Sequence, residues 1–496
     1  MPQKNILALD QGTTSTRAIV FDGAGRVVSS ASQPLQQIYP NAGWVEHDAS
    51  AIFSDAVAVI RDVLNQSSGN LPAALGITNQ RETVLLWDRK TGEPISNAIV
   101  WQDRRTADQC ADLRKSGFET EISQKTGLLL DPYFSATKIA WSLDNIDGAR
   151  KRAENRELLA GTIDCWLLWK LTNGQIHFTD ATNASRTMLF DIHRGVWDEQ
   201  LLGIFDIPAA ILPEVGDCQG QFGVTDGDII GAEIPITGIA GDQQAAAFGQ
   251  ACLEPGSVKA TFGTGCFVLA NTGNSAVSSR NRLLTAVFTQ IDGVSRYALE
   301  GSLFMAGETI QWLRDNLGII ANVHESEMLA KSADPNSGVY LVPAFQGLGA
   351  PHWDPDARAI ISGLSRAAGK AELVRAALEG VAYQTMDLMA AIEDDFSHSR
   401  SDRPQRLKVD GGMARNDWFM QFLADMLDMP VARAGQQEAT ALGAAFHAGL
   451  AVGLYKEESE CSALWQSNHT FEPSMKQSER DFRLEGWRTA LLKTRS

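Results

Sequence analysis

Near its start the chain has two short apolar runs separated by a polar loop. The runs at residues 6–9 and 18–21 flank the loop DQGTTSTR, residues 10–17, and Asp22-Gly23 is a turn signal. Two apolar runs joined by glycine and hydroxyl residues predict a β-hairpin. Its tip offers backbone N–H groups, hydroxyls and a cation, which suit a phosphate. Asp10 is placed for a hydrated Mg²⁺ that bridges phosphate oxygens, although a surface hairpin with a salt bridge is the alternative interpretation.

The rest of the first half alternates predicted strands and helices. Strands are expected at residues 74–78 and 83–87, on either side of the polar Asn79-Gln80-Arg81-Glu82. Asp48 is a plausible N-cap for a helix. The apolar face of that helix has helical spacing and consists of Ile52, Ala56, Val59, Ile60 and Val63. Further helices are predicted at residues 105–115 and 135–144.

A second strand–loop–strand unit occurs about half a chain later. Apolar runs at residues 258–262 and 266–270 flank Gly263-Thr264-Gly265. Two hairpins with glycine and threonine at the tip, each heading a half rich in β and α elements, indicate an internal duplication. Sequence identity between the halves is slight, and a chance resemblance is the alternative. We therefore expect an α/β protein with two similar domains on either side of a cleft, residues 1–251 and 252–496. The last predicted helix, residues 474–493, would cap the second domain through Phe482, Trp487 and Leu491.

Composition narrows the class of protein. A chain of 496 residues can hold two domains with full cores, and 44% hydrophobic with 21% charged residues is ordinary for a globular protein. The net charge of −17 argues against nucleic acid or an anionic membrane as partner. No run has the length of a signal-peptide core or a membrane span. We expect a cytoplasmic protein without membrane insertion; the sequence leaves its oligomeric state open, a homo-oligomer included.

Familiar metal and phosphate motifs are missing from the sequence. The six cysteines are scattered, without a C-x-x-C pair or accompanying histidines, so a structural zinc site or a disulfide framework is not expected. Reduced, mostly buried thiols are expected instead. The stretch 363–370 approaches a Walker A motif but has one residue too many, and Ala371 stands where Ser or Thr is required. Any phosphate site must be of another kind.

A third element with possible nucleotide chemistry follows the apolar run that begins at Leu407. Asp410-Gly411-Gly412 ends this run and opens a helix. Because glycine has no Cβ, the backbone here can approach a ligand closely; a simple tight turn is the alternative. With the two hairpins, the element resembles the adenosine-side motif of the actin-like ATPase superfamily, and this resemblance would place Gly412 and Asn416 near the base and α-phosphate. Gly307 and Gln311, at the start of a predicted helix over 307–316, are further candidates for the nucleotide's edge.

Two polar segments are candidates for a substrate site. Asp242 lies between a strand-like segment and an alanine-rich helix. Its carboxylate can accept a hydroxyl proton and can lie near Mg²⁺, but a helix N-cap would explain it as well. Arg81-Glu82 pairs donors with an acceptor and can bind neighbouring hydroxyls of a polyol, although a surface ion pair is the commoner meaning. Trp101, Tyr133 and Phe267 could wall the carbon edge of a small polyol or belong to the core.

Nearly the whole chain resembles the FGGY family of carbohydrate kinases, and within it the branch that acts on glycerol. The motifs that carry the resemblance are residues 8–15 (ALDQGTTS), 76–83 (GITNQRET), 99–102 (IVWQ), 131–135 (DPYFS), 182–187 (TNASRT), 238–244 (GIAGDQQ), 262–267 (FGTGCF), 342–345 (VPAF) with 349–354 (GAPHWD), and 410–412 (DGG). The resemblance implies an actin-like, ribonuclease H-like fold in each domain. It implies ATP-dependent phosphorylation of glycerol to sn-glycerol 3-phosphate in glycerol catabolism, with ATP and Mg²⁺ in the interdomain cleft.

The resemblance also implies roles for individual residues. Glycerol hydroxyls would be bound by Arg81, Glu82, Tyr133, Asp242 and Gln243, and its carbons by Trp101 and Phe267. The nucleotide would be bound by Thr13, Thr14, Ser15, Arg17, Thr264, Gly307, Gln311, Gly412 and Asn416. Asp10 and Asp242 would hold the metal, and Asp242 would be the catalytic residue.

Two alternatives to glycerol phosphorylation stay open. A kinase for another small polyol or a ketopentose would share the nucleotide motifs, but the combination of Arg81-Glu82 with three aromatic residues describes a small closed pocket. An actin-like nucleotide-switch ATPase would need the nucleotide motifs and no polyol site.

One loop departs from a pattern found in part of the family. Some bacterial members bind fructose 1,6-bisphosphate in a loop with several glycines and an arginine. The corresponding stretch here, residues 225–235, has Glu233 in place of the arginine, together with Asp226 and Asp228. We therefore expect insensitivity to the bisphosphate at this loop.

Overall fold

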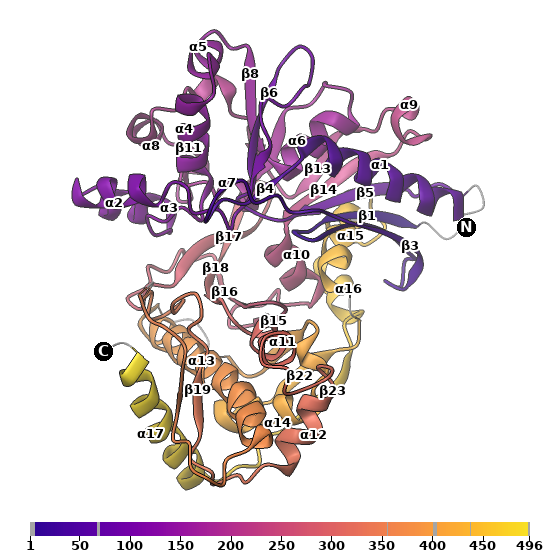
Figure 1. Ribbon diagram of the computed structural model, residues 1–496. Helices are drawn as coiled ribbons and strands as arrows, with labels where there is room; N and C mark the ends of the chain where they lie inside the picture. The colour runs from indigo at the N-terminus through magenta and orange to yellow at the C-terminus, as the bar shows by residue number, and fades with distance from the viewer. Residues whose placement is uncertain (1–4, 67–69, 355, 400–403, 437, 495–496) are drawn as a thin grey trace. The chain divides into compact units, whose positions relative to one another are not determined.

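The computed structural model describes residues 5–66, 70–354, 356–399, 404–436 and 438–494 (Figure 1). It divides into two compact units. The first unit comprises Met1–Leu253, Thr285–Ala298 and Glu438–Leu464, and the second comprises Glu254–Leu284, Leu299–Gln437 and Trp465–Ser496. The first unit therefore also includes a hairpin and a helical segment from the second half of the sequence.

The first unit contains most of the strands. They are β1 (Ile6–Gln11), β2 (Ser15–Phe21), β3 (Val27–Pro34), β4 (Glu46–His47), β5 (Ala74–Asn79), β6 (Val84–Asp88), β7 (Ala98–Ile99), β8 (Leu158–Thr162), β9 (Phe178–Asp180), β10 (Phe190–Asp191), β11 (Val196–Trp197), β12 (Glu214–Gly216), β13 (Gln219–Val224) and β14 (Pro235–Gly241). Its helices are α1 (Ala49–Gln66), α2 (Ala107–Lys115), α3 (Glu119–Thr126), α4 (Ser135–Asn145), α5 (Ala149–Glu154), α6 (Ile163–Leu171), α7 (Ala181–Ala184), α8 (Glu199–Phe205), the 3₁₀ turn η1 (Ala209–Ile211), α9 (Gly227–Ile230), α10 (Asp242–Gly249), α15 (Ala439–Ala451) and α16 (Glu458–Ala463).

The second unit is built from β15 (Val258–Phe262), β16 (Cys266–Gly273), β19 (Tyr340–Val342), β20 (Ile360–Ser362), β21 (Leu407–Asp410), β22 (Val431–Ala434) and β23 (Ser467–Phe471), with α11 (Gly307–Asp315), α12 (Glu325–Ser332), α13 (Lys370–Ser399), the 3₁₀ turn η2 (Met413–Arg415), α14 (Asp417–Leu427) and α17 (Gln477–Thr494). The remaining strands, β17 (Leu284–Ile291) and β18 (Val294–Leu303), form the hairpin that contains Thr285–Ala298. Among the described residues no helix is long and apolar enough to cross a membrane.

The principal sheets of the two units share a five-strand order with the same strand directions, as the predicted duplication requires. In the first unit the order β13-β14-β5-β1-β2-β3 combines antiparallel β1–β2 and β13–β14 with parallel β1–β5 and β5–β14. In the second unit the order β16-β15-β21-β22-β23 combines antiparallel β15–β16 and β22–β23 with parallel β15–β21 and β21–β22. The first strand of each predicted hairpin, β1 or β15, thus has a parallel strand, β5 or β21, on its other side. The predicted two similar α/β domains are confirmed.

Local sequence signals placed the first elements well. The predicted hairpin is β1–β2, with Asp10 paired with Arg17 across it. The Asp48 carboxylate accepts hydrogen bonds from the backbone N–H groups of Ser50 and Ala51, at 2.8 and 3.2 Å, as expected of an N-cap. All five apolar residues predicted for the buried face of α1 are buried. The six cysteines are free and buried, as expected.

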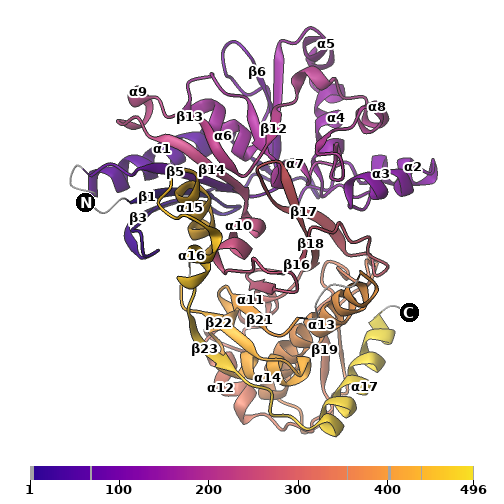
Figure 2. The same cartoon turned by 180° about the vertical axis from the view of Figure 1, so that it is seen from behind.

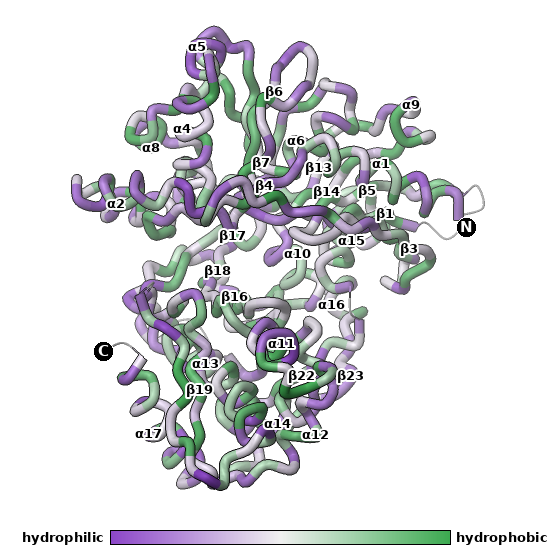
Figure 3. The backbone as a smooth tube through the Cα atoms, viewed as in Figure 1, coloured by the Kyte–Doolittle hydropathy of each residue, from purple (hydrophilic) through white to green (hydrophobic). Residues whose placement is uncertain are grey.

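The C-terminal helix packs on the second unit but not through every residue predicted. In Figure 3 hydrophilic and hydrophobic stretches alternate along α17, and this helix contacts β19, β20 and α13 (Figure 2). Trp487 and Leu491 are buried, but Phe482 is 67% exposed, so its assignment to the buried face was wrong. The buried face instead includes the stems of Arg480 and Arg483, because long charged side chains can cover apolar surface while their heads find carboxylate partners.

The central strands of the first unit carry large residues on one face and glycines on the other. Leu75, Ile77, Ile236 and Ile239 belong to the apolar core that also contains residues of α1 and α6. On the opposite face, a Cβ at Gly76 would lie 2.2 Å from the Ala444 carbonyl oxygen, and one at Gly238 would lie 2.5 Å from the Ala448 nitrogen. Glycine at these positions lets α15 lie directly on the sheet.

The crossing of α15 and α10 is equally close. A Cβ at Gly443 of α15 would lie 1.8 Å from the Ala245 carbonyl oxygen of α10. We expect Gly443→Ala to force the helices apart and to destabilise the first unit by about 3 kcal/mol, the upper end of overpacking effects. Scanning calorimetry should show a melting temperature about 5–10 °C lower.

The matched control is Gly203→Ala in α8, where an added Cβ meets nothing within 4 Å. This change should leave the melting temperature unchanged or raise it slightly, because alanine restricts the unfolded chain. Equal melting temperatures for the two variants would contradict close packing between α10 and α15.

Candidate active site

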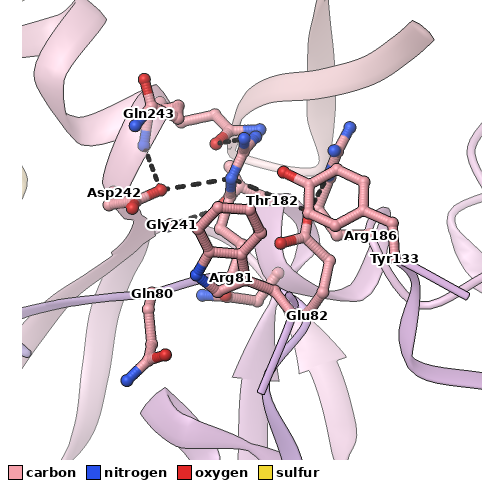
Figure 4. Close-up of polar contacts among 12 residues, drawn as sticks. Gln80, Arg81, Glu82, Tyr133, Thr182, Arg186, Gly241, Asp242 and Gln243 are labelled. Carbon is pink, nitrogen blue, oxygen red and sulfur yellow. Dashed lines mark hydrogen bonds and ion pairs between the residues drawn. The ribbon is translucent and has the colours of Figure 1, made fainter. Parts of the chain in front are cut away.

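The polar candidates of the first unit follow two neighbouring parallel strands. Gly241, the last residue of β14, is paired in register with Asn79, the last residue of β5. Gln80-Arg81-Glu82 and Asp242-Gln243 therefore emerge at the same edge of the sheet, since the carboxyl ends of parallel strands lie together. Figure 4 shows the side chains of Arg81, Glu82 and Asp242 close together with that of Tyr133, from the loop before α4, whereas the Gln80 side chain points away from them.

Arg81 is the centre of the cluster. Its Nε atom lies 3.2 Å from Asp242 Oδ1 and 4.0 Å from Glu82 Oε1, and its terminal nitrogen donates to Gln244 Oε1 at 3.1 Å. The side chains of Arg81 and Glu82 are each only 2% exposed, whereas that of Asp242 is 28% exposed. The interpretation of Arg81-Glu82 as a surface ion pair is therefore wrong, because a buried guanidinium between two carboxylates presents a desolvated set of donors and acceptors.

Asp242 is not the cap of its helix. Gly241 occupies the N-cap position, and Asp242 is the first residue of α10. The Asp242 carboxylate accepts from the Gln243 backbone N–H at 2.7 Å and faces Arg81 (Figure 4). The N-cap explanation is therefore wrong: the Asp242 carboxylate is partly exposed beside Arg81 at the start of α10.

Glu82 is held in an uncommon backbone conformation. Its φ angle is 60°, in the left-handed region that non-glycine residues seldom occupy. The Ser135 hydroxyl donates to the Glu82 carbonyl at 3.0 Å, and the Arg186 Nε atom donates to the Glu82 carboxylate at 2.6 Å. Such strained residues persist where surrounding contacts determine them, often in functional sites.

Two of the three predicted aromatic residues lie together beside this cluster. The rings of Trp101 and Tyr133 pack edge to face with centroids 5.6 Å apart. The Trp101 indole donates to the Thr13 hydroxyl at 2.9 Å, which links these rings to the first hairpin. The buried Lys138 ammonium donates to the Tyr133 carbonyl at 2.7 Å, and burial lowers the pKa of Lys138 to about 7. The third, Phe267, is a half-buried residue of β16 in the second unit.

The first hairpin has the predicted polar tip, and it also contains the salt bridge of the alternative interpretation, between Asp10 and Arg17. Gly12 N–H donates to the Ser15 carbonyl at 2.9 Å, and Thr14 is exposed at the tip while Thr13 and Ser15 are half-buried. Arg17 lies 2.5 Å from Asp10 and 2.6 Å from Glu438. Burial raises the pKa of Asp10, and the Arg17 charge opposes that rise.

The donor set around Asp10 fits Mg²⁺ bound to a nucleotide. The described residues contain no group of three or more His, Cys, Asp or Glu side chains that could hold a metal. Mg²⁺ in kinases is commonly held by one or two carboxylates together with substrate phosphates and waters. A single buried carboxylate beside the hydroxyls of the hairpin tip matches that requirement, and an all-protein cage is not needed.

In the second unit the candidate nucleotide-binding residues also follow the ends of two neighbouring parallel strands. Thr261 of β15 is paired with Asp410 of β21, so the tip at residues 263–265 and the glycines at 411–412 emerge side by side. Gly263 and Thr264 are exposed, and the Thr264 carbonyl accepts from the backbone N–H groups of Ala306 and Glu308 at 2.9 and 3.2 Å. The start of α11, with Gly307 and half-buried Gln311, is thereby tied to the tip.

The glycines of the second unit differ in their surroundings. A Cβ at Gly307 would lie 2.6 Å from the Gly263 carbonyl oxygen. Gly411 has φ 93°, and a Cβ there would lie 2.3 Å from the Phe262 carbonyl oxygen. Gly412 instead faces open space, with nothing within 4 Å of an added Cβ. Asn416 caps α14 by accepting from Phe419 N–H at 2.9 Å and also donates to the Ser326 hydroxyl at 3.2 Å. Gly412 thus leaves room for a ligand. Asn416, in contrast, caps α14 and binds Ser326.

The structure thus brings the predicted residues into two sets. The first unit holds Asp10, Thr13, Thr14, Ser15, Arg17, Arg81, Glu82, Trp101, Tyr133, Asp242 and Gln243, and the second holds Thr264, Phe267, Gly307, Gln311, Gly412 and Asn416. Sequence reasoning assigned no role to Arg186, Ser135 and Lys138, which contact Glu82 or Tyr133. It also assigned none to Thr182, which contacts Gly241 beside Asp242. The available signals were the DPYFS motif for Ser135 and the TNASRT motif for Thr182 and Arg186, which contributed to the family resemblance without a chemistry assigned to these residues.

Comparison with known families defines the class of protein. Residues 5–249 match the N-terminal domain of the FGGY family of carbohydrate kinases, and residues 258–452 match its C-terminal domain. The chain belongs to this family. The predicted family and its actin-like, ribonuclease H-like two-domain fold are confirmed.

Individual proteins of this family are similar to the chain over nearly its full length. The chain is similar to the glycerol kinase of Allorhizobium ampelinum, with 55% identity over 99% of this chain and 98% of the relative. The glycerol kinase of Rhodospirillum centenum is 54% identical over 99% and 98% of the two chains. The crystal structure of Plasmodium falciparum glycerol kinase with ADP matches with a TM-score of 0.94 and 35% identity, covering 99% of this chain and 98% of that one. A xylulose kinase from Lactobacillus acidophilus shares the fold, with a TM-score of 0.88 at 22% identity and coverage of 99% and 97%.

Proposed function

We propose that this protein transfers the γ-phosphoryl group of ATP to glycerol, forming sn-glycerol 3-phosphate. The observation that carries the proposal is the buried Arg81-Glu82 pair with Asp242 Oδ1 3.2 Å from Arg81 Nε. This arrangement offers a guanidinium fork and two carboxylates to a small molecule with adjacent hydroxyls. Glycerol kinases at 54–55% identity over nearly the full chain support the same activity.

In this proposal the polar residues orient glycerol and Asp242 accepts its proton. Arg81 donates to one hydroxyl and Glu82 accepts from its neighbour, with Tyr133 and Gln243 completing the set. Asp242 orients the attacking hydroxyl and takes its proton late, because positioning and charge stabilisation dominate in a loose phosphoryl-transfer transition state. Trp101, with Tyr133 beside it, and Phe267 pack against the carbon atoms.

Candidate nucleotide-binding residues occur in each unit. Thr13, Thr14, Ser15 and Arg17 would contact phosphates from the first hairpin, and Thr264, Gly307, Gln311, Gly412 and Asn416 would serve the phosphates and adenosine. Asp10 and Asp242 would hold Mg²⁺, which when bound neutralises charge on the phosphate oxygens. We place the domain boundary at residue 251. Residues 1–251 would hold the first phosphate hairpin and the glycerol site, apart from Phe267, and residues 252–496 the second phosphate hairpin and the adenosine site. Family matches that end at 249 and resume at 258 support this boundary.

The proposed location and partners of the protein follow from its proposed substrates and its net charge. An enzyme that consumes ATP needs a compartment that supplies it, which supports a cytoplasmic location and a role in glycerol catabolism. The net charge of −17 supports the absence of a nucleic-acid partner. A homo-oligomer is compatible with these proposals, and they do not depend on it.

A coupled assay of ADP formation across a panel of polyols tests the proposed function. We expect ADP to form stoichiometrically with glycerol and only slowly with pentitols and ketopentoses. A preference for a larger sugar would favour the kinase alternative, and ADP formation that is independent of any polyol would favour an actin-like ATPase. Either result would overturn glycerol as the substrate.

The loop at residues 225–235 predicts insensitivity to fructose 1,6-bisphosphate. Asp226 caps α9 by accepting from Asp228 N–H at 2.8 Å, and Asp228 and Glu233 are both exposed. Three carboxylates would repel a bisphosphate that requires guanidinium or N–H donors. Titration of the bisphosphate at fixed ATP and glycerol should leave the rate unchanged. Saturable inhibition in the low-millimolar range or below, abolished by substitutions at 225–233, would contradict this prediction.

A further inference from the structure

The segment at residues 180–187 contacts both strand ends that carry the proposed glycerol site. Asp180 caps the short helix α7, and the Thr182 hydroxyl accepts from Gly241 N–H at 2.9 Å, one residue before Asp242. The side-chain amides of Asn183 and Asn79 exchange two hydrogen bonds of 3.0 Å, one residue before Gln80. The backbone of α7 is therefore fixed to the ends of β14 and β5 together.

Arg186 projects from the end of this segment into the site (Figure 4). Its Nε atom donates to Glu82 Oε1 at 2.6 Å, and the two side chains are 1% and 2% exposed. The guanidinium carbon also lies 5.4 Å from the centre of the Tyr133 ring and 5.1 Å from that of Phe134. One buried cation thus contacts two of the residues to which glycerol hydroxyls are assigned.

The charges explain why such a contact matters for the ligand. Burying the Glu82 carboxylate is costly unless cations and hydrogen bonds compensate it. Arg81 Nε is 4.0 Å from Glu82 Oε1, whereas Arg186 Nε is at hydrogen-bond distance from the same oxygen. A carboxylate accepts about four hydrogen bonds, so a fixed donor on one side aims the remaining lone pairs in a defined direction.

We propose that Arg186 is a positioning residue that orients the Glu82 carboxylate and the Tyr133 ring for the polyol. The proposal rests on the proposed function and deepens it, because it assigns part of the glycerol affinity to a residue that touches neither the γ-phosphate nor the reacting hydroxyl. A buried ion pair that only stabilises the fold is the alternative, and the experiment below separates the two.

The test measures steady-state constants for Arg186→Met. Misplacing Glu82 by about 1 Å should raise the KM for glycerol on the order of 100-fold. We expect kcat within about 3-fold and the KM for ATP within about 2-fold of the wild type, since the lost contact serves glycerol binding. If Arg186→Met fails to fold, Arg186→Lys keeps a buried cation without the planar fork, and its KM for glycerol should rise about 10-fold.

Two comparisons exclude a merely structural role. Arg483→Met removes another buried arginine, which lies 3.4 Å from Glu379 in the second unit; it should lower the melting temperature and leave both KM values unchanged. In a Glu82→Gln background, Arg186→Met should raise the KM for glycerol less than about 5-fold, because the partner charge is already gone. Behaviour like that of Arg483→Met, or the same loss in both backgrounds, would overturn the proposal.

Failure of the proposed function shows separately, in the wild type. If the wild-type protein forms no ADP with glycerol, the proposed function fails. The role of Arg186 is then judged by the same comparison of KM values on the polyol that the wild type does phosphorylate. If the wild type phosphorylates no polyol, both proposals fail.

Discussion

Replacing Asp242 by Asn should lower turnover by roughly 10²–10⁴-fold while weakening glycerol binding only modestly. The substitution keeps the size of the side chain but removes the proton acceptor. It also removes one of the negative charges near Arg81, whose Nε atom lies 3.2 Å from Asp242 Oδ1. Because Arg81 retains Glu82 and Gln244 as neighbours, the pocket should keep its shape. The measurement is kcat from coupled ADP formation, with glycerol binding followed by titration calorimetry.

A matched control is Asp144→Asn, which removes a half-exposed carboxylate that pairs with Arg150 elsewhere in the first unit. Turnover of this control should stay within about 2-fold of the wild type, because exposed ion pairs contribute little. Near-normal turnover in Asp242→Asn would remove Asp242 from the mechanism. A loss of binding as large as the loss of turnover would assign Asp242 to substrate affinity instead.

Glycerol should be preferred over 1,2-propanediol by on the order of 10³-fold or more in kcat/KM. The diol lacks one terminal hydroxyl, so a buried donor or acceptor of the Arg81-Glu82 pair loses its ligand partner. Both side chains are only 2% exposed, and water cannot readily substitute for the missing hydroxyl. The measurement compares kcat/KM for the two substrates at saturating ATP.

The Glu82→Gln variant provides the internal comparison for this prediction. An amide in place of the carboxylate weakens acceptance from the hydroxyl, so the preference for glycerol should shrink by at least about 10-fold. Comparable efficiency of the wild type on both substrates would show that the polar pair is not a recognition site. An unchanged preference in Glu82→Gln would assign the discrimination to other residues.

Strand and helix positions followed closely from local sequence. The apolar runs of both hairpins correspond to β1, β2, β15 and β16, because periodicity and glycine-rich turns are local properties of the chain. The motifs at residues 80–82 and 242–243 were recognised as candidate chemistry for the same reason. Phe482 was misassigned because helical spacing alone cannot show that charged stems of Arg480 and Arg483 cover the core in its place.

The sequence by itself determined the class of fold, the duplicated hairpins and the residue types available for phosphate and polyol chemistry. Only the tertiary structure decided which of the open interpretations held. Burial of Arg81 and Glu82, the placement of Asp242 after rather than at the N-cap, and the contact of Arg186 with Glu82 all depend on the pairing of β5 with β14 and on α7. These contacts join residues up to 163 positions apart, and their formation depends on packing of the whole unit, which no local pattern of residues encodes.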